Sequence, residues 1–166
     1  MTTLTRALTL AAATMLCSSA AQAQQYRVDL VLEGGLATHA DFRRCPAEHG
    51  TADCGTAVAR ITRSTGTLYG LTTRAMSPNG HDSVTVQDGK LRIKPLDGRT
   101  PAVTLLTIGS GTVGGVVISP DSRYAFAVVQ NATGNPSDVM MIELATQNGV
   151  AAVSLDSRVV GLAMAR

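Results

Sequence analysis

The amino-acid sequence predicts an all-β protein that is built from repeated units of four antiparallel strands. Two observations predict this class. Short runs of alternating apolar residues are separated by Gly, Pro, Asn and Asp, and one turn motif occurs twice at a fixed spacing. The composition agrees, since 16 Gly and only 16% charged residues in a chain of 166 are typical of turn-rich β proteins. With 3% aromatic residues and no Trp, the core must be mainly aliphatic.

Residues 1–23 have the features of a secretory signal peptide. Arg6 provides a positive charge, residues 7–16 form a ten-residue apolar run, and Ala21-Gln22-Ala23 matches a small-residue cleavage site. The apolar run is about half as long as a membrane-spanning helix must be. We therefore expect a mature chain that begins at Gln24, in the periplasm or outside the cell, with no membrane span after cleavage.

Residues 24–56 are predicted to hold one strand and one loop. The run 26–32 alternates well enough to be a half-buried strand. Residues 36–55 show no clean periodicity and are interpreted as an irregular loop. This loop contains Cys45 and Cys54, which in an oxidising compartment are most simply a disulfide that staples the loop.

Two alternatives to the disulfide remain open. The first is a metal site formed by Cys45, His49 and Cys54, with His39 as a further ligand, although this spacing matches no common zinc pattern. The second is a pair of free thiols. No metal and no cofactor is expected.

A predicted strand at 57–63 precedes the first complete unit, residues 66–108. A tight turn at Ser77-Pro78-Asn79-Gly80 divides its first two strands, because Pro fixes φ at the second turn position and Asn-Gly tolerates positive φ. Asp88-Gly89 predicts a two-residue hairpin, and Asp97-Gly98 predicts a further turn. The strands of this unit are expected at 67–76, 82–87, 90–94 and 102–108.

Residues 109–155 form the second and clearest unit. Its central turn is Ser119-Pro120-Asp121-Ser122, in which the Asp121 carboxylate is expected to cap backbone N–H groups. A polar loop at 131–137 separates the later strands. The strands of this unit are expected at 113–119, 124–130, 138–144 and 150–155, and residues 156–166 supply one more strand at 158–165 as a partial third unit.

The two turns set the length of the repeat. Pro78 and Pro120 lie 42 positions apart, and Ser77 and Ser119 precede them. A period of roughly 40–45 residues with four strands per unit is the signature of a β-propeller blade. We therefore expect residues 57–166 to form a partial or small propeller-like array of antiparallel four-stranded blades.

The segment TIGSGTVGGVVISPDSRYAFAVV, followed by VMMIELATQNGVAAVSL, resembles the YVTN-type β-propeller repeat. That repeat has a Gly-rich approach, an apolar strand, a Ser-Pro-Asp-Gly turn and an aromatic-rich strand, and Ser122 here takes the place of its usual Gly. The resemblance is good over residues 102–165, fair over 66–101 and absent over 24–56. It implies a propeller fold but no single activity, since such propellers host binding proteins, hydrolases and redox enzymes alike.

The mature chain has room for about three units, whereas typical propellers have four to eight blades. The strand at 158–165 is expected to pair with the strands at 26–32 and 57–63 and to complete a third blade, as ring closure in this family implies. Three interpretations stay open: two chains that join into a six-bladed ring, a shortened piece of a longer propeller, or a compact partial propeller that is stable alone.

The catalytic residues, if there are any, are unknown from the sequence. The three His residues, which are His39, His49 and His81, show no catalytic motif, and the chain contains no G-x-S-x-G elbow. Lys90, Arg92 and Lys94 alternate on one strand, which predicts either a patch for an anionic partner or a guard against edge pairing. The absence of a long basic block argues against nucleic-acid binding.

These patterns favour an exported binding or scaffold protein without an evident catalytic site. We expect it to contact a protein partner through the loops 36–55 and 131–137, or to self-associate through edge strands. The alternative is a fragment or subunit of a larger propeller enzyme, either a lactonase-like hydrolase or a quinoprotein-type dehydrogenase.

Overall fold

The computed structural model describes residues 24–44, 58–61, 70–106, 111–131 and 136–165, and every regular element in these ranges is a β-strand. The strands form three antiparallel four-stranded sheets, so the predicted all-β, blade-repeat class is confirmed. The closing sheet contains β12 (Val159–Met164), β1 (Gln24–Leu32), β2 (Ala37–Arg44) and β3 (Val58–Ile61) in that order. The first-repeat sheet contains β4 (Arg74–Met76), β5 (Asp82–Gln87), β6 (Lys90–Pro95) and β7 (Val103–Leu106). The second-repeat sheet contains β8 (Gly111–Ile118), β9 (Tyr124–Asn131), β10 (Ser137–Glu143) and β11 (Asn148–Leu155).

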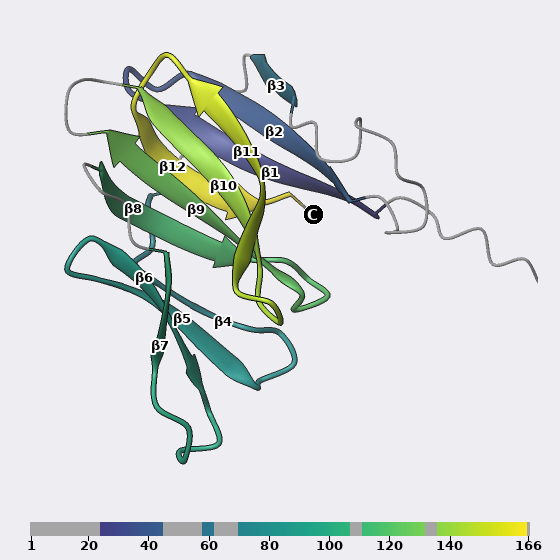
Figure 1. Ribbon diagram of the computed structural model, residues 1–166. Coiled ribbons are helices and arrows are strands. Elements are labelled where there is room, and N and C mark those ends of the chain that lie inside the picture. The colour runs from purple at the N-terminus through teal and green to yellow at the C-terminus, as the bar shows by residue number, and fades with distance from the viewer. Residues whose placement is uncertain (1–23, 45–57, 62–69, 107–110, 132–135, 166) are drawn as a thin grey trace, which may run out of the picture.

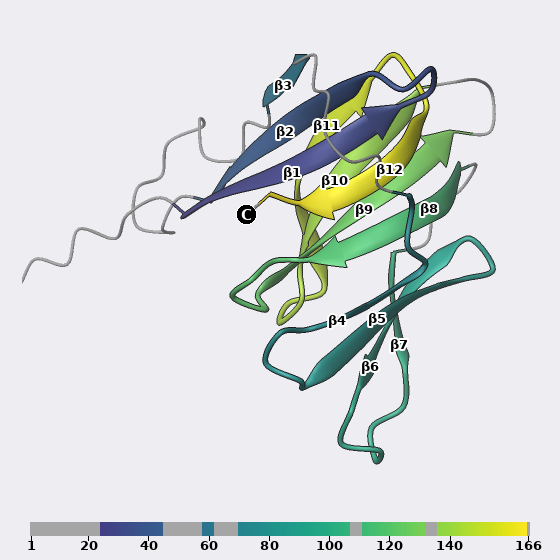
Figure 2. The ribbon, with the colours of Figure 1, turned by 180° about the vertical axis from the view of Figure 1, so that it is seen from behind.

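The second-repeat sheet lies between the other two sheets (Figures 1 and 2). Its strand β9 is buried on both faces, with its aromatic residues on one side and its alanines on the other. Tyr124 and Phe126 pack in a core cluster with the closing sheet, whereas Ala125 and Ala127 pack in a second cluster with the first-repeat sheet. The continuous apolar run YAFAVV is therefore the sequence of a central strand that is covered on both faces.

The C-terminal strand completes the sheet that the N-terminal strands begin. β12 pairs antiparallel with β1, for example Leu30 with Leu162, and β1 in turn pairs with β2. The expected pairing of the C-terminal strand with residues 26–32 is thus present, whereas the strand at residues 58–61 pairs with β2 and not with β12. Inward-facing side chains of this sheet, such as Val28 and Phe42, are fully buried against the second-repeat sheet.

Residues 37–44 correct the sequence analysis, which assigned them to an irregular loop. They form β2, which pairs along most of its length with β1. The strand does alternate, since Thr38, Ala40 and Phe42 are buried, but only Phe42 is strongly apolar. The period-2 signal was therefore too weak to recognise before the partner strand was known.

The segment before β4 also differs from the expected strand at 67–76, because only Arg74–Met76 is paired as a strand. Residues just before it cross β8 instead. The Val116 N–H donates to the Thr72 carbonyl at 2.9 Å, and the Thr72 hydroxyl donates to the Val116 carbonyl at 2.9 Å. Gly115 makes room for this crossing, since a Cβ there would lie 3.0 Å from the Leu71 side chain. Because Gly115 of β8 has no side chain, residues 71 and 72 can pass close to this strand.

The outer face of the first-repeat sheet is polar and basic. In β6, Leu91 and Ile93 are buried in the core, so the alternating Lys90, Arg92 and Lys94 lie on the opposite face. Arg74 of β4 lies in the same cross-strand row as Arg92. Four like charges on one face oppose the packing of a further sheet there.

Candidate binding site at the Ser-Pro end

One end of the molecule collects the repeated turns and is called here the Ser-Pro end. It is defined by the turns 77–81, 119–123 and 144–147, by residues 24–27 of β1 and by residues 164–165 at the end of β12. Side-chain contacts between the second-repeat and closing sheets hold it together. Arg44 at the end of β2, for example, pairs with Glu143 at the end of β10 at 3.5 Å.

The two Ser-Pro turns have the same internal hydrogen bonds. The buried Ser77 hydroxyl lies 2.7 Å from the Asn79 side-chain oxygen and accepts from the Asp82 N–H at 2.8 Å. The equivalent Ser119 hydroxyl donates to the Asp121 carboxylate at 2.6 Å, and it accepts from the Tyr124 N–H at 3.0 Å. Each Ser hydroxyl thus joins the turn to the strand that follows it. The side chain two positions later, Asn79 or Asp121, is hydrogen-bonded to that hydroxyl.

The last turn position differs between the repeats and connects them. Gly80 has φ of +74°, and Ser122 takes its place with φ of +61°, a region that non-Gly residues rarely adopt. The Ser122 hydroxyl accepts a hydrogen bond from the Asn79 backbone N–H at 3.0 Å. The Ser122 hydroxyl therefore makes a contact that Gly could not make, although Ser is less suited than Gly to this φ.

Asp121 accepts a hydrogen bond from a backbone N–H, as the sequence predicts, and two further hydrogen bonds from side chains. One carboxylate oxygen accepts from the Ser119 hydroxyl and from the Arg123 N–H, and the other accepts from the Tyr26 hydroxyl at 2.7 Å. Tyr26 belongs to β1, so this bond joins the closing sheet to the second-repeat turn. The Tyr26 ring also packs edge-on against Tyr124, with centroids 5.1 Å apart.

Arg123 and Gln24 extend this network at the surface. Arg123 donates from its guanidinium to the Gln24 side-chain oxygen at 3.1 Å. Its guanidinium carbon also lies 5.9 Å from the centroid of the Tyr124 ring, within cation–π range. The guanidinium is therefore positioned by two contacts and keeps most of its five donors for other acceptors.

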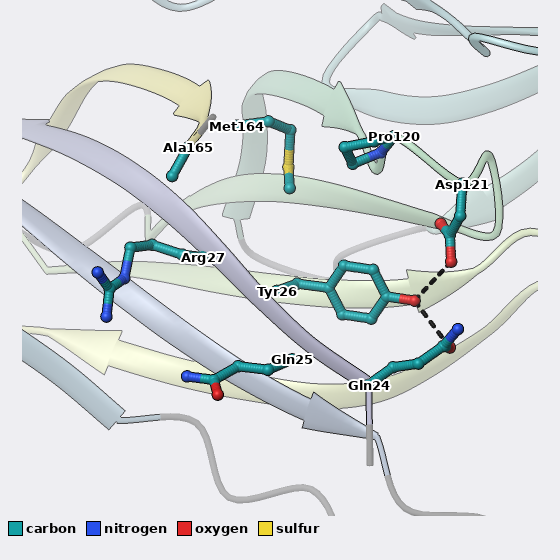
Figure 3. A pocket seen from close by; sticks show the side chains of 8 residues that line it. All are labelled: Gln24, Gln25, Tyr26, Arg27, Pro120, Asp121, Met164 and Ala165. Atoms are coloured by element: carbon teal, nitrogen blue, oxygen red, sulfur yellow. Dashed lines mark hydrogen bonds between the residues drawn. The ribbon is translucent and has the colours of Figure 1, made fainter. Parts of the chain in front are cut away.

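A cavity of about 290 Å³ opens beside these groups (Figure 3). Figure 3 shows the Tyr26 hydroxyl directed at Asp121 and Gln24, with Pro120 and Met164 at the edge of the cavity. The lining residues come from β1, from the second Ser-Pro turn and from the end of β12: Gln24, Gln25, Tyr26, Arg27, Pro120, Asp121, Met164 and Ala165. Hydroxyl, amide and carboxylate groups thus lie together beside a small apolar surface, which suits the recognition of a polar ligand.

The hydrogen bond between Tyr26 and Asp121 helps to shift the pKa of both groups away from neutrality. Burial of Tyr26, together with its hydrogen bond to Asp121, raises its pKa well above the ordinary value. Partial burial of Asp121 would raise its pKa, but the hydrogen bonds from Ser119, Tyr26 and Arg123 outweigh it and lower the pKa. The phenol stays protonated and the carboxyl stays ionised at neutral pH. Neither group therefore has the pKa near neutrality that general acid–base catalysis requires.

The other sequence-predicted residues lie elsewhere or outside the described residues. Cys45, Cys54 and His49 lie outside them. His39 lies on β2, 3.6 Å from Asp41, which is also paired with Arg27 at 2.8 Å. The described residues contain no group of three or more His, Cys, Asp or Glu side chains placed to hold a metal ion.

The structure describes only part of the two loops that were expected to contact a partner, since residues 45–55 and 132–135 lie outside the described ranges. β2 ends with Arg44 at the Ser-Pro end, paired with Gln24. β9 starts with Tyr124 at the Ser-Pro end and ends with Asn131 at the other end. The described part of loop 36–55 thus runs along β2 from the end where Asn131 lies to the Ser-Pro end, and the partner contact expected for both loops stays a prediction.

The sequence analysis missed Gln24, Tyr26 and Arg123. The local sequence carried no signal for them, because Tyr26 and Asp121 are 95 positions apart and belong to different sheets. The match between the two turns was a usable signal for Arg123, since it follows the turn as His81 follows the first turn.

Comparisons with known proteins give limited similarity. No protein-family model matches the chain, and no curated protein matches it. Among solved structures, the chain is similar to part of a mitotic checkpoint complex, with 16% identity and a TM-score of 0.47 over 57% of this chain and 30% of that chain. It is also similar to TolB from Acinetobacter baumannii, with 13% identity and a TM-score of 0.40 over 80% of this chain and 31% of that chain. The chain thus spans less than a third of the length of either protein.

Within the described ranges, the structure has no helix with the length and apolar character needed to cross a bilayer.

Proposed function

We propose that the chain is an exported binding or scaffold protein that contacts a protein partner through the Ser-Pro end. The observation that carries this proposal is the convergence of polar side chains from two sheets around the 290 Å³ cavity. Tyr26, Asp121, Gln24 and Arg123 are held by hydrogen bonds to one another. A polar surface that is fixed before binding loses little conformational freedom on association.

The exposed residues around the cavity are suited to a protein surface. Pro120, Asp121 and Arg123 are exposed at the tip of the second Ser-Pro turn, and Asn79 is exposed on the first. They project from turns that are anchored by buried Ser side chains, so they are presented by a rigid scaffold. Charges of both signs lie side by side, which favours a specific complementary partner over a simple polyanion or polycation.

Position-specific photo-crosslinking in the cell tests the binding surface. A photoreactive residue at the exposed Gln147, in the β10–β11 turn of the Ser-Pro end, should give a discrete adduct with a partner protein. The same residue at the exposed Gln87, in the β5–β6 hairpin, is the matched control and should give none. Arg123→Ala should weaken the adduct at Gln147. Equal adducts at both positions, or none at either, would contradict the proposal.

Export is tested separately by fractionation and by the mass of the purified native protein. The proposal expects the protein in the periplasmic or extracellular fraction with Gln24 as its first residue. A cytoplasmic protein that retains residues 1–23 would remove export from the proposal, while the crosslinking result would still report on the binding surface.

A further inference from the structure

A second cavity lies between the first-repeat and second-repeat sheets and opens at the Ser-Pro end. Its volume is about 410 Å³, within the usual range for small-molecule sites. Ile93, Val103 and Leu144 give it an apolar wall. The complete lining is Asp82, Ile93, Pro95, Thr100, Val103, Ser122, Arg123, Glu143, Leu144, Ala145 and Gln147.

The repeat itself explains why this cavity exists. Asp82 follows the first Ser-Pro turn at the position that Tyr124 has after the second turn, 42 residues later. Tyr124 is fully buried and fills the space between the second-repeat and closing sheets against Tyr26. A short aspartate at the equivalent position leaves the corresponding space between the first-repeat and second-repeat sheets unfilled.

Two of the three charged residues of the cavity already have partners. Arg123 is bonded to Gln24 at 3.1 Å. Glu143 accepts from the Thr146 hydroxyl at 2.8 Å and is paired with Arg44 at 3.5 Å. The Gln24 amide thus satisfies one donor of Arg123, and Arg44 offsets the charge of Glu143 without a ligand.

Asp82 differs from them. Its backbone N–H and carbonyl are bonded to Ser77, but its half-buried carboxylate makes no hydrogen bond or ion pair with any residue in the part of the chain that the structure describes. A partly desolvated carboxylate is unfavourable unless a donor or cation meets it. Asp82 is therefore the charged lining residue whose side chain has no partner among the described residues.

We propose that this cavity binds a small organic ammonium ion, whose cationic nitrogen meets the Asp82 carboxylate and whose apolar body lies against Ile93, Val103 and Leu144. The Thr100, Ser122 and Gln147 side chains add polar groups to the lining. This inference concerns a small ligand in a different cavity, so it does not depend on the partner surface proposed above.

Binding of phenethylamine to the full mature chain, measured by isothermal titration and by chemical-shift changes, tests the inference. Phenethylamine should bind saturably and shift the resonances of Ile93, Val103 and Leu144. Phenethyl alcohol has nearly the same shape without the charge and should bind at least about tenfold more weakly, since a hydrogen bond between charged groups is replaced by a weaker one.

Asp82→Asn should weaken phenethylamine binding at least about tenfold, because it removes the charge and keeps the shape. Asp156→Asn is the matched control: it alters an exposed acid in the turn between β11 and β12 and should leave binding unchanged. Ala145→Trp fills the mouth of the cavity from an exposed position, so it provides a second route to the same loss if Asp82→Asn does not fold. No saturable binding of the amine, equal binding of the alcohol, or unchanged binding to the folded Asp82→Asn or Ala145→Trp variant would overturn the inference.

Discussion

The side-chain hydroxyl of Ser122 accepts a hydrogen bond from the backbone N–H of Asn79 at 3.0 Å. This bond connects the two copies of the Ser-Pro turn, and it arises at a position where Gly would be the residue best suited to the backbone. The first repeat has Gly80 there. Ser122 therefore has an unfavourable backbone conformation but makes a hydrogen bond between the two repeats.

Substitution of Ser122 separates these two effects. Ser122→Ala keeps the positive φ and loses the hydrogen bond, so it should lower the free energy of unfolding by about 1 kcal/mol. Ser122→Gly loses the same bond but relieves the backbone, so its stability should lie close to that of the wild type. Urea denaturation of the three proteins measures the order. An alanine variant as stable as the glycine variant would show that backbone conformation is unimportant here.

Removal of the Tyr26 hydroxyl should destabilise the protein, because the phenol is bonded to the ionised Asp121 across two sheets. We expect Tyr26→Phe to lower the free energy of unfolding by about 1–3 kcal/mol. Tyr124→Phe is the matched control, since the buried Tyr124 hydroxyl has no hydrogen-bond partner among the described residues. Its loss should be neutral or stabilising. Equal effects of the two substitutions in thermal and urea unfolding would contradict the role of the Tyr26–Asp121 bond.

Acid should remove part of the stability through Asp121. Its folded-state pKa is lowered, while its pKa in the unfolded chain is near 3.9. The contribution is therefore fully present above the unfolded pKa and is lost as the pH falls through the folded pKa. The difference in unfolding free energy between the wild type and Asp121→Asn should be constant above about pH 5 and should shrink below about pH 4. A difference that stays constant from pH 7 to pH 3 would exclude this linkage.

A side chain at Gly115 should destabilise the crossing of residues 71 and 72 over β8. The new Cβ of Gly115→Ala would lie 3.0 Å from Leu71 and 3.3 Å from the Thr72 carbonyl, so we expect a loss of about 1–3 kcal/mol. Gly149→Ala is the control, because its Cβ would meet only the flexible end of Met140 at 3.4 Å. Combining Gly115→Ala with Leu71→Ala should cost less than the sum of the two single losses in a double-mutant cycle. Strict additivity would mean that the two residues do not compete for this space.

Cys45 and Cys54 lie outside the described residues, and their disulfide remains a prediction from the sequence. Thiol titration of denatured, unreduced protein should find no free thiol, and reduction should lower stability by roughly 2–3 kcal/mol, since it frees a short loop. Cys45→Ser with Cys54→Ser should reproduce the reduced protein. Two reactive thiols before reduction would refute the disulfide, and zinc that copurifies with them would favour the metal-site alternative.

The pattern of strands and turns was predictable because its causes are local. Alternation in residues such as 82–87 follows from the two faces of a strand, and the turn at Ser77-Pro78-Asn79-Gly80 follows from the backbone preferences of Pro and Gly. The spacing of the two Pro residues then predicted four-stranded units, and the sheets have that size. The weak alternation of residues 37–44 was not recognised, because a strand with one strongly apolar residue is defined mainly by its neighbours.

By itself, then, the sequence determined the all-β class and the four-stranded repeat, and its resemblance to a propeller repeat implied the pairing of the C-terminal strand with the first strand. Tertiary structure alone decided which side chains meet at the Ser-Pro end. Tyr26 and Asp121 carry no mutual signal in sequence, because their contact requires the packing of two sheets. The sequence likewise did not show the effect of Asp82 at the position that Tyr124 has in the second repeat. A short side chain creates a cavity only where the facing sheet does not fill the space. Strand and turn preferences depend on consecutive residues, whereas a binding site depends on distances that are fixed only when the sheets pack together.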